Sequence, residues 1–472
     1  MKMLQVIIDN GWRLWFIFSL CLGSLLYGVY AGRHELFPYS QLRDAKVAAK
    51  AIVEVFRAES DSGAADNAGG GEGTEEPGPD IARPTVINHV QTTDDSLILV
   101  AGGPGFLKKY HEDGGCLAWL MDRQGEVKHI WKFRSDLWPE MKTVKSLPLV
   151  GLSYAYPVDV HLLDDGGILV SFQARNTWPF AIGMARLDKD SNIIWKKEFN
   201  AHHWFTITPD KKIITPSLRM MDAPRAVGRT QSRIQGDNGK YFDDMITTLT
   251  MDGEILEQVS MLDVLEKSGL NSLFYGSVND APRDVNTDDP LHLNFIERVG
   301  EEIAAERPEF NADDLLVSFR QLNTLAIIDR PSWTIKWISS GSTHRQHCPR
   351  FLDSKHILIF DNQGGDMSLG GTRLARMSLD RRLAETVFPT SENPPASRVY
   401  SKSAGFIDIG RERKTALMSV TNQGRLLEID LATALPRWEY QFVEEGVKRP
   451  NLFCARYIYN VSFPLNQVEA GK

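Results

Sequence analysis

Cysteine is scarce in this chain, with 4 among 472 residues. Cys21 lies in an apolar N-terminal stretch, so Cys116, Cys348 and Cys454 remain for the rest of the chain. So few cysteines give little support for a disulfide framework, and their spacing matches no zinc-binding pattern. A single disulfide bond could still form after export. We expect it between Cys116 and Cys454, because they lie near opposite ends of the folded region.

An excess of basic residues is also lacking, since 53 lysines and arginines face 61 aspartates and glutamates, giving a formal net charge of -8. A nucleic-acid-binding groove usually needs clustered lysine and arginine, so we expect no nucleic-acid partner. The acidic balance mainly favours solubility. Because 42% of the residues are hydrophobic, the chain has ample apolar material for a buried core.

Long apolar runs are rare, and the clearest is residues 14–32, "LWFIFSLCLGSLLYGVYAG", which carries no charge. Its length is about what a helix needs to cross a bilayer. Residues 29–31, Val-Tyr-Ala, also fit a signal-peptidase site, so cleavage is the alternative to an uncleaved anchor. Either case predicts export. We expect residues 1–33 to form a single-pass inner-membrane segment, with the rest of the chain on the periplasmic side.

The next residues predict a helix and then a linker. Residues 34–58 contain good helix formers with apolar residues at helical spacing, which indicates a membrane-proximal helix. Residues 59–83 are small, acidic and rich in glycine and proline, and are therefore expected to be a flexible tether. The folded domain should occupy residues 84–472.

That domain consists of two alternating kinds of predicted β-hairpin. Hairpins of the first kind carry an aromatic residue, often Trp131, Trp195, Trp337 or Trp438, which we expect to pack between repeats: "CLAWLMDRQGEVKHIWKF", "GMARLDKDSNIIWKKEF", "TTLTMDGEILEQV", "LNTLAIIDRPSWTIKWI", "LARMSLDRRLAETVF" and "GRLLEIDLATALPRWEY". The second kind falls between them: "DVHLLDDGGILVSFQ", "HHWFTITPDKKIITPS", "NADDLLVSFR", "HCPRFLDSKHILIFDN" and "AGFIDIGRERKTALMSV".

Four strands per repeat, at intervals of roughly 40 to 60 residues, are typical of a β-propeller. The aromatic hairpins predict an all-β chain with a six-bladed propeller. "LILVAGG" should open the first blade, and "LFCARYIYNVSF" should close the ring by pairing with that blade. "NFIERVGEEIAAERPEF" is expected to be a helical insertion. The alternative fold, a pair of β-sandwiches, would not explain the regular alternation.

Four histidines are expected immediately before, or at the start of, the first strand of a second-kind hairpin: His161, His203, His292 and His347. In a propeller the innermost strands surround a central channel, so equivalent positions from different blades should meet around one axis. Asn294 shares a strand face with His292 because side chains alternate. Arg320 ends a strand, with Asn323 three residues later, and its fork of donors suits an oxyanion. A salt bridge to an acid in the channel is the alternative for Arg320.

These motifs together resemble the bacterial arylsulfate sulfotransferases, periplasmic six-bladed propellers that move a sulfuryl group between phenols without a nucleotide donor. "AHHWF" looks like the family's His-His motif and "LHLNF" like its His-x-Asn motif. "LLVSFRQLNT" looks like its strand ending in Ser-x-Arg, and "RQHCPRFLDSKHILIFDN" like its Gln-His motif with Asp-Asn after the next strand. The resemblance spans roughly residues 95–445. Trp204 stands where the family usually has Asp, and Phe319 and Cys348 are atypical neighbours.

The resemblance implies that His347 is the nucleophile and forms a sulfohistidine, since neutral imidazole attacks well and also leaves well. Arg320, His292 and Asn294 would hold the sulfuryl oxygens as a preorganised site. His203 would manage the phenolic proton, with His202 as its stand-in. Two further substrate-binding residues are expected: Asn323 and His161.

The implied partners are an aryl sulfate donor and a phenolic acceptor, with no cofactor and no metal, and a homo-oligomer remains possible. Two other classes of function stay open. The propeller could be a membrane-tethered binding platform in the cell envelope, or a metal-dependent hydrolase with histidines and acids such as Asp361 as ligands. The second is disfavoured by the scarcity of carboxylates beside the histidines.

Overall fold

The computed structural model describes two parts of the chain, which belong to two compact units, Met1–Ala64 and Ala65–Lys472. In the first unit it describes helical residues 15, 19–24 and 26–27. In the second it describes residues 85–465 apart from 91–94, 113, 135, 139–154, 175–179, 229–232, 237–238, 275–287, 364–369, 394–397 and 445–449.

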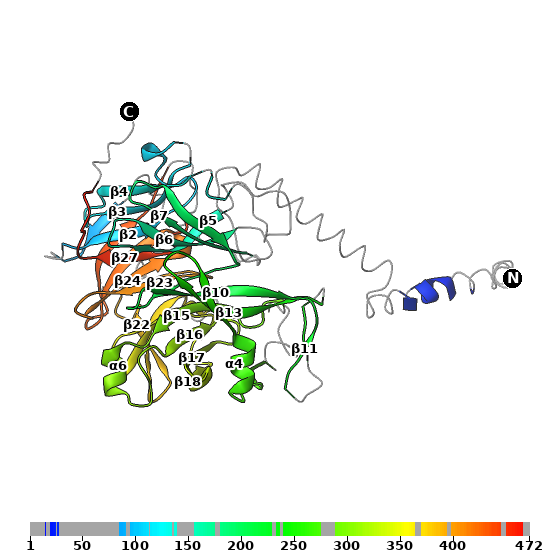
Figure 1. Ribbon diagram of the computed structural model, residues 1–472. Helices are drawn as coiled ribbons and strands as arrows, with labels where there is room; N and C mark the ends of the chain where they lie inside the picture. The colour runs from blue at the N-terminus through cyan, green and yellow to red at the C-terminus, as the bar shows by residue number, and fades with distance from the viewer. Residues whose placement is uncertain are drawn as a thin grey trace, which may run out of the picture. The chain divides into compact units, whose positions relative to one another are not determined.

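Six antiparallel sheets follow one another along the second unit and form the blades of a propeller (Figure 1). The first three blades, each listed from the innermost strand outwards, are β27 (Ala455–Ile458), β2 (Leu97–Ala101), β3 (Cys116–Met121) and β4 (Val127–Lys132); β5 (Ala155–Leu162), β6 (Ile168–Ala174), β7 (Ala181–Leu187) and β8 (Ile193–Glu198); and β9 (Thr206–Ile207), β10 (Lys212–Met221), β13 (Tyr241–Thr250) and β14 (Ile255–Ser260).

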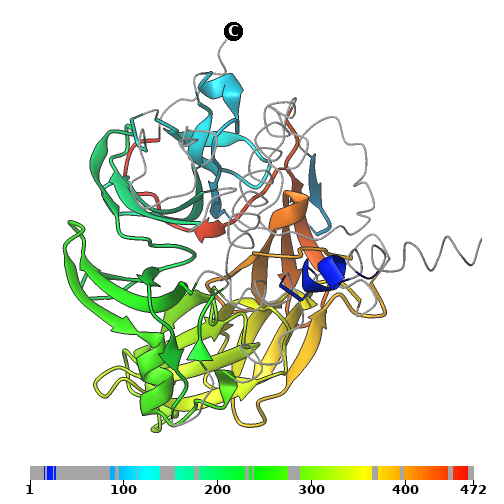
Figure 2. The same cartoon turned by 90° about the vertical axis from the view of Figure 1, so that its right-hand side faces the viewer.

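The other three blades follow the same order. They are β15 (Leu293–Arg298), β16 (Leu315–Phe319), β17 (Thr324–Asp329) and β18 (Thr334–Ser340); β19 (His347–Phe351), β20 (His356–Asp361), β21 (Arg373–Ser378) and β22 (Ala384–Phe388); and β23 (Phe406–Ile409), β24 (Thr415–Val420), β25 (Arg425–Asp430), β26 (Pro436–Gln441) and the added β1 (Thr85–Asn88). The blades lie around a common centre in Figure 2. The predicted six-bladed propeller is confirmed, and the sandwich alternative is wrong.

Both ends of the propeller interlock with a blade formed mostly by the other end. The C-terminal β27 pairs with β2 in the first blade, from Leu97 opposite Ile458 to Val100 opposite Ala455. The N-terminal β1 pairs with β26 in the sixth blade. The predicted closure by "LFCARYIYNVSF" is therefore confirmed. The ring is held shut by backbone hydrogen bonds at two places rather than one.

Four tryptophans of the outer strands each join their blade to the next one. Each indole Nε1–H donates to a backbone carbonyl of the neighbouring blade: Trp131 to Gly166 at 3.2 Å, Trp195 to Met251 at 2.9 Å, Trp337 to Leu379 at 2.7 Å and Trp438 to Arg123 at 2.8 Å. Trp131 and Trp438 are fully buried. These residues therefore pack between blades, as the sequence predicts.

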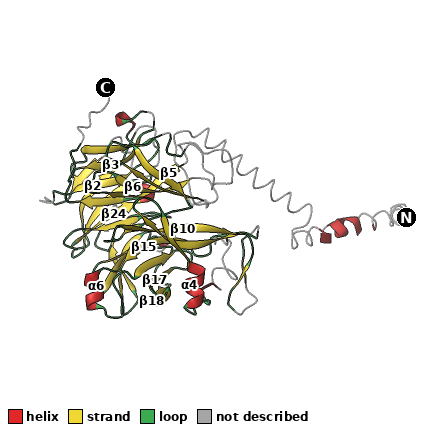
Figure 3. Ribbon diagram, in the orientation of Figure 1, coloured by secondary structure: helices red, strands yellow, loops and turns green. Residues whose placement is uncertain are grey.

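Strands make up most of the regular secondary structure of the described propeller, as the yellow arrows of Figure 3 show. Its helices are α4 (Met261–Lys267) and α6 (Glu301–Glu306), with short 3-10 turns η1 (Lys108–Tyr110) and η5 (Thr421–Gln423). The two-residue strands β11 (Arg225–Ala226) and β12 (Arg233–Ile234) pair beyond the long β10–β13 hairpin. The helical prediction for "NFIERVGEEIAAERPEF" is confirmed for its middle, where α6 is inserted between β15 and β16 of the fourth blade, and is wrong for its start. The residues "NFIER" belong to the innermost strand β15, because "LNFIER" buries its first four side chains against neighbouring blades.

The expected disulfide is wrong, because Cys116 and Cys454 are both free and buried in different places. The Sγ of Cys116 faces the carbonyl of Leu107 at 3.8 Å, whereas that of Cys454 faces Asp159 at 3.3 Å. Among the described residues, no helix is long and apolar enough to cross a membrane. Most of the apolar stretch 14–32, and all of the helix and linker expected at 34–83, lie outside the described residues.

Tyr457 provides a test of ring closure. Its side chain in β27 is 6% exposed, and its hydroxyl donates to Glu428 at 2.8 Å. Replacing a large buried ring by alanine removes this bond and leaves a cavity, so Tyr457→Ala should lower the free energy of unfolding by about 3 kcal/mol. Urea unfolding followed by tryptophan fluorescence measures the change. The exposed Asn460 serves as control, and Asn460→Ala should be neutral; equal midpoints for the two variants would contradict closure by β27.

Candidate active site

Three of the predicted histidines meet where three neighbouring innermost strands begin. His203 lies just before β9, His292 directly before β15, and His347 is the first residue of β19. The ring centroids of His203 and His292 are 5.0 Å apart, and those of His203 and His347 are 6.3 Å apart. His203 and His292 have positive φ angles of 54° and 53°, so backbone strain is concentrated at this point.

His161 does not belong to this cluster, so its expected equivalence to the other three is wrong. It is the second-last residue of the eight-residue β5, at the far end of the strand rather than at its start. Its Nε2 contacts Asp159 at 3.2 Å, and its ring packs on Phe205 at 4.3 Å.

The imidazole of His347 is fixed in one orientation. Its side chain is buried, and its Nδ1 lies 2.7 Å from Oδ1 of Asn362, which directly follows β20. The amide nitrogen of Asn362 donates to the carbonyls of Ser401 and Ala404, so its oxygen must face the histidine. Because that oxygen can only accept, Nδ1 of His347 carries the proton and Nε2 keeps its lone pair.

Neighbouring groups keep His347 in its neutral form. Burial, followed by the positive charge of Arg320, holds the pKa of His347 well below its ordinary value. An imidazole that is neutral at physiological pH, with one nitrogen already used as a donor, presents a nucleophilic Nε2. This is the chemical state that group transfer to histidine requires.

His202 and His203 form a second buried pair, with their Nδ1 atoms 2.6 Å apart. Burial, and then the proximity of His292, lowers the pKa of His202 to about 3. Burial and then His202 lower the pKa of His203 in the same direction. Gln173 contacts Nδ1 of His203 at 3.2 Å and accepts from the hydroxyl of Tyr156 at 3.0 Å. Both histidines are therefore neutral and held by a chain of polar side chains.

Two carboxylates that the sequence analysis did not select lie against these histidines. Asp289 makes a short hydrogen bond through Oδ2 to Nδ1 of His292, and Asp244 of β13 lies 3.6 Å from Nε2 of His202. Both acids are at most 1% exposed. The expected scarcity of carboxylates beside the histidines is thus wrong. The i, i+3 spacing in "DPLH" was an available signal for Asp289, whereas Asp244 comes from a distant strand.

The two carboxyl groups differ in charge. Burial, and then the charge of Asp289, raises the pKa of Asp244 well above its usual value. Burial also opposes ionisation of Asp289, but His292 outweighs it and holds the pKa of Asp289 below the usual value. Asp289 is therefore the ionised partner of His292, and Asp244 is the neutral member of the pair.

Arg320 directly follows β16 and is the cation of the site. Burial, together with the nearby Arg345, lowers its pKa to about 10, so the guanidinium remains charged at neutral pH. Within the described part of the chain its side chain makes no ion pair, and its buried Nε has no hydrogen-bond partner. The alternative of a salt bridge to an acid in the channel is not found among these residues.

The two predicted asparagines hold the loop that carries His347. Asn294 donates from Nδ2 to the carbonyl of Gln346 at 2.8 Å, and Asn323 accepts from the backbone N–H of Arg345 at 2.8 Å. Gln346 is itself anchored in the fourth blade through Ser318 at 3.1 Å. These contacts make Asn323 a positioning residue, and they use one of the two N–H donors of Asn294.

Trp204 forms an aromatic floor beneath the histidines. It is fully buried, lies 5.8 Å from the His347 ring, and packs on Phe406 at 6.0 Å and Phe295 at 6.5 Å between ring centroids. Cys348 is also buried, and its Sγ contacts the backbone of Ile407 in the next blade. Burial raises the pKa of the Cys348 thiol, which makes it a poor competing nucleophile.

Phe180 forms an apolar wall on the opposite side. Its ring centroid lies 5.5 to 5.8 Å from those of His202, His203 and His292. Behind it, Leu218 and Phe242 of the long β10–β13 hairpin complete a small apolar cluster. An aromatic wall and an aromatic floor around charged and polar groups suit a ligand with a flat ring and an anionic end.

Buried polar atoms without a protein partner gather at this site. Within the described residues, six of them belong to His202, Trp204, Asp244, Asp289, Asn294 and Arg320. Such concentration is typical of a place completed by a ligand or water. The described residues contain no group of three or more His, Cys, Asp or Glu arranged for a metal ion. Asp361, the acid considered as a ligand, instead pairs with Arg373 at 2.8 Å.

The buried neutral histidines predict loss of stability in acid. His202 keeps a folded pKa of about 3, while the unfolded chain takes up this proton near pH 6.5. The unfolded state therefore binds more protons below pH 6.5, and stability should fall from there towards pH 3. Between pH 7 and pH 5 the loss should be about 2 kcal/mol from His202. Urea unfolding of wild type and His202→Gln at both pH values measures it.

The exposed His344 provides the control. His344→Gln should keep the full dependence on pH, and His202→Gln should be less sensitive to acid than wild type. An identical dependence in all three proteins would show that His202 is protonated in the folded state.

Comparison with solved structures gives distant similarities in fold. A protein of unknown function from Bacteroides caccae is 12% identical, with a TM-score of 0.45 over 78% of this chain and 100% of the other. A putative 6-phosphogluconolactonase from Bacteroides fragilis is 11% identical, with a TM-score of 0.40 over 78% and 99%. A virginiamycin B lyase from Staphylococcus aureus is 13% identical, with a TM-score of 0.32 over 61% and 85%. None of these scores reaches 0.5, so they carry no argument about function.

No curated protein matches the chain in sequence. A family model does match, over residues 159–442, and its description is Arylsulfotransferase (ASST). The match covers more than half of the chain and includes β9, β15, β16 and β19, the strands that carry the histidine cluster and Arg320. The chain belongs to the arylsulfotransferase family.

Proposed function

We propose that this protein transfers a sulfuryl group from an aryl sulfate to a phenol through a sulfohistidine at His347. One observation carries the proposal: Asn362 accepts a hydrogen bond from Nδ1–H of His347 at 2.7 Å, which leaves a neutral imidazole with the lone pair on Nε2, near Arg320, whose guanidinium makes no ion pair within the described residues. Family membership supports the reaction class.

In the first half-reaction Nε2 of His347 attacks sulfur, the bond between sulfur and the phenolic oxygen breaks, and the phenolate leaves with the electron pair. The sulfuryl oxygens carry negative charge throughout. Arg320 offers a planar set of N–H donors for them, and the second N–H of Asn294 is a further donor in reach of the same loop. Donors that are already held in place need not reorganise during transfer, which is the main electrostatic contribution.

His292 is better placed than His203 to handle the phenolic proton. Asp289 accepts from Nδ1 of His292, so an imidazolium there is stabilised and its Nε2 can donate to the leaving phenolate. His203 has no carboxylate on its ring and is surrounded by other positive or neutral nitrogen groups, which oppose its protonation. Asp289 acts through His292 and is a positioning residue.

In the second half-reaction the acceptor phenol gives its proton back to His292 while its oxygen attacks sulfur. The bond between sulfur and Nε2 of His347 then breaks, and His347 and His292 return to their starting forms. Water would compete for the same sulfuryl group. His347 is buried against the ring of Trp204, and Phe180 packs on the neighbouring His203, so the surroundings favour an aromatic acceptor over water.

A location in the cell envelope remains a second part of the proposal. It rests on the uncharged apolar stretch 14–32, which suits either a membrane anchor or an export signal. A periplasmic propeller would meet aryl sulfates before they enter the cytoplasm.

The covalent mechanism predicts ping-pong kinetics, with parallel double-reciprocal lines when donor and acceptor are varied. Donor alone should leave an acid-labile sulfuryl group on the peptide containing "QHCPRF", detected by mass spectrometry. His347→Asn should lack the adduct and lose at least about 10⁴-fold in kcat, because a nucleophile contributes that much.

Cys348→Ala is the matched control, since it removes the neighbouring thiol and leaves the imidazole. This variant should keep both the adduct and the turnover. Intersecting lines without an adduct on His347 would rule out the covalent route. Absence of any aryl sulfate turnover in wild type would instead favour the binding platform.

The role of Asp289 predicts an effect that depends on the leaving group. Asp289→Asn removes the carboxylate that stabilises protonated His292, so protonation of the departing oxygen should be lost. Turnover of an unactivated phenyl sulfate should fall by about 10²- to 10⁴-fold. Turnover of 4-nitrophenyl sulfate should fall far less, because its phenolate leaves without a proton. Steady-state kcat for a series of donors gives the comparison.

Asp314→Asn is the control for this experiment. Asp314 is also fully buried in the fourth blade, but it pairs with Lys336 at 2.9 Å, away from the histidines. Its loss should lower stability without changing the ratio between donors. A uniform loss across all donors in Asp289→Asn would assign Asp289 a purely structural role.

A further inference from the structure

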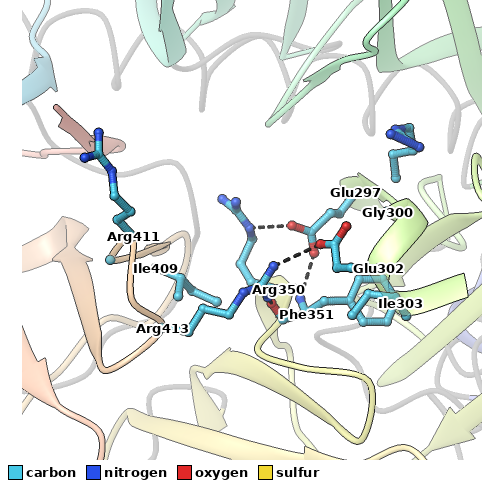
Figure 4. A pocket seen from close by; sticks show the side chains of 11 residues that line it. Glu297, Gly300, Glu302, Ile303, Arg350, Phe351, Ile409, Arg411 and Arg413 are labelled. Carbon is cyan, nitrogen blue, oxygen red and sulfur yellow. Dashed lines mark hydrogen bonds and ion pairs between the residues drawn. The ribbon is translucent and has the colours of Figure 1, made fainter. Parts of the chain in front are cut away.

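A second polar pocket lies at the opposite end of the innermost strands. It has a volume of about 230 Å³ and is shown in Figure 4. Its residues are the last ones of β15 and β19 and the turn after β23, among them Glu297, Arg350 and Arg411. The histidines begin the same strands, so along a five-residue strand the two places are on the order of 13 Å apart. The layer of Trp204, Phe295 and Phe406 lies between them.

Arginines outnumber acids among the residues that line this pocket. Four guanidinium groups line it, and two carboxylates accompany them: Arg298, Arg350, Arg411, Arg413, Glu297 and Glu302. Arg298 is used elsewhere, by Glu301 at 2.8 Å and Asp313 at 3.1 Å. Arg350 pairs with Glu297 at 2.8 Å and with the nearby Asp408 at 3.5 Å, and Arg413 pairs with Glu302 at 3.0 Å. Arg411 is therefore the arginine of the pocket whose charge no carboxylate of the described residues balances.

Two of these arginines are held rigidly by other contacts. Arg350 donates from Nε to Glu297 at 2.8 Å, which directs its terminal nitrogens away from that carboxylate (Figure 4). Arg413 donates to the carbonyls of Phe351 and Leu352 and to Glu302, whose side chain is 61% exposed. Preorganised guanidinium groups lose little entropy when they bind an oxyanion.

Arg411 is the free cation of the pocket. Its guanidinium lies over the ring of Tyr459, 4.3 Å from the centroid, and makes no hydrogen bond or ion pair with any residue in the described part of the chain. Stacking leaves the in-plane N–H donors available.

We propose that the pocket of Arg350, Arg411 and Arg413 binds a small oxyanion, a carboxylate, phosphate or sulfate, independently of the histidine site. The unpaired donors of Arg411 and the clamped Arg350 supply the charge, and the cavity sets an upper limit on size. Because Glu302 is exposed, its ion pair with Arg413 can break, and Arg413 then binds the anion. The site does not depend on the proposed sulfuryl transfer.

The test titrates sodium sulfate, phosphate and malonate at constant ionic strength, with chloride as reference, and follows binding by calorimetry and the shift of Tm. Low millimolar concentrations keep general salt effects small. Arg411→Gln should weaken binding by at least about tenfold, because a hydrogen bond to a charged group is lost. Arg381→Gln is the control, since Arg381 is 69% exposed in another part of the fifth blade. The three probes distinguish planar from tetrahedral anions.

Arg320→Gln distinguishes anion binding at the histidine site from binding in the arginine pocket, and it should leave binding in the arginine pocket intact. Loss of binding in Arg320→Gln with retention in Arg411→Gln would place the anion among the histidines and overturn the proposal. Equal affinities in all four proteins, or no binding to wild type at these concentrations, would overturn it as well. Aryl sulfate turnover in Arg411→Gln reports separately on the proposed function.

Discussion

A hydrogen bond from an indole to a backbone carbonyl joins one blade to the next, and it recurs at four of the blade boundaries. The bond fixes the angle between neighbouring sheets, because a buried indole N–H must find its acceptor. With β27 and β1 interlocked at the closure, the ring cannot open at one blade without breaking contacts at another. The histidines belong to three different blades, so their mutual distances depend on this angular order.

Burial then determines the chemistry of what the ring brings together. The same desolvation acts with opposite signs on the two kinds of group. It keeps His202, His203 and His347 neutral, and it pushes Asp244 towards its neutral form. Two buried groups remain charged. Asp289 is stabilised as a carboxylate by His292, and Arg320 stays protonated because the ordinary pKa of a guanidinium is far above neutral pH. The site therefore holds a neutral imidazole, His347, beside the permanent cation of Arg320.

Much of the architecture could be predicted from the sequence because hairpins are local. Alternating apolar residues, turn residues and tryptophan specify β3–β4, β17–β18 and β25–β26 without information from elsewhere in the chain. The starts of β15 and β19 follow in the same way, so His292 and His347 could be placed. The rest of β15 was harder to predict than its start, because the apolar residues of "LNFIER" also suit a helix. The segment forms a strand because its side chains pack between blades.

Other parts of the site depend on contacts that no local pattern contains. His161 was misplaced because β5 has eight residues whereas β19 has five, and the extra length puts the histidine at the other end of the channel. Asp244 reaches His202 from a strand about forty residues later, and Asn362 is recognisable as the partner of His347 only when β19 and β20 are paired. The disulfide prediction also failed on tertiary position, since Cys116 and Cys454 are buried in different hydrophobic clusters.

Trp204 shows how the chain accommodates its departure from the usual Asp of the family. A carboxylate at that position could support the double histidine directly, and an indole cannot. Here Asp244 lies 3.6 Å from His202, which in turn contacts His203, so a carboxyl group reaches the pair from β13 of the same blade. The position is then free for an aromatic ring, which packs on Phe406 and His347. The carboxyl group and the aromatic ring thus reach the histidines from different strands, and neither displaces the other.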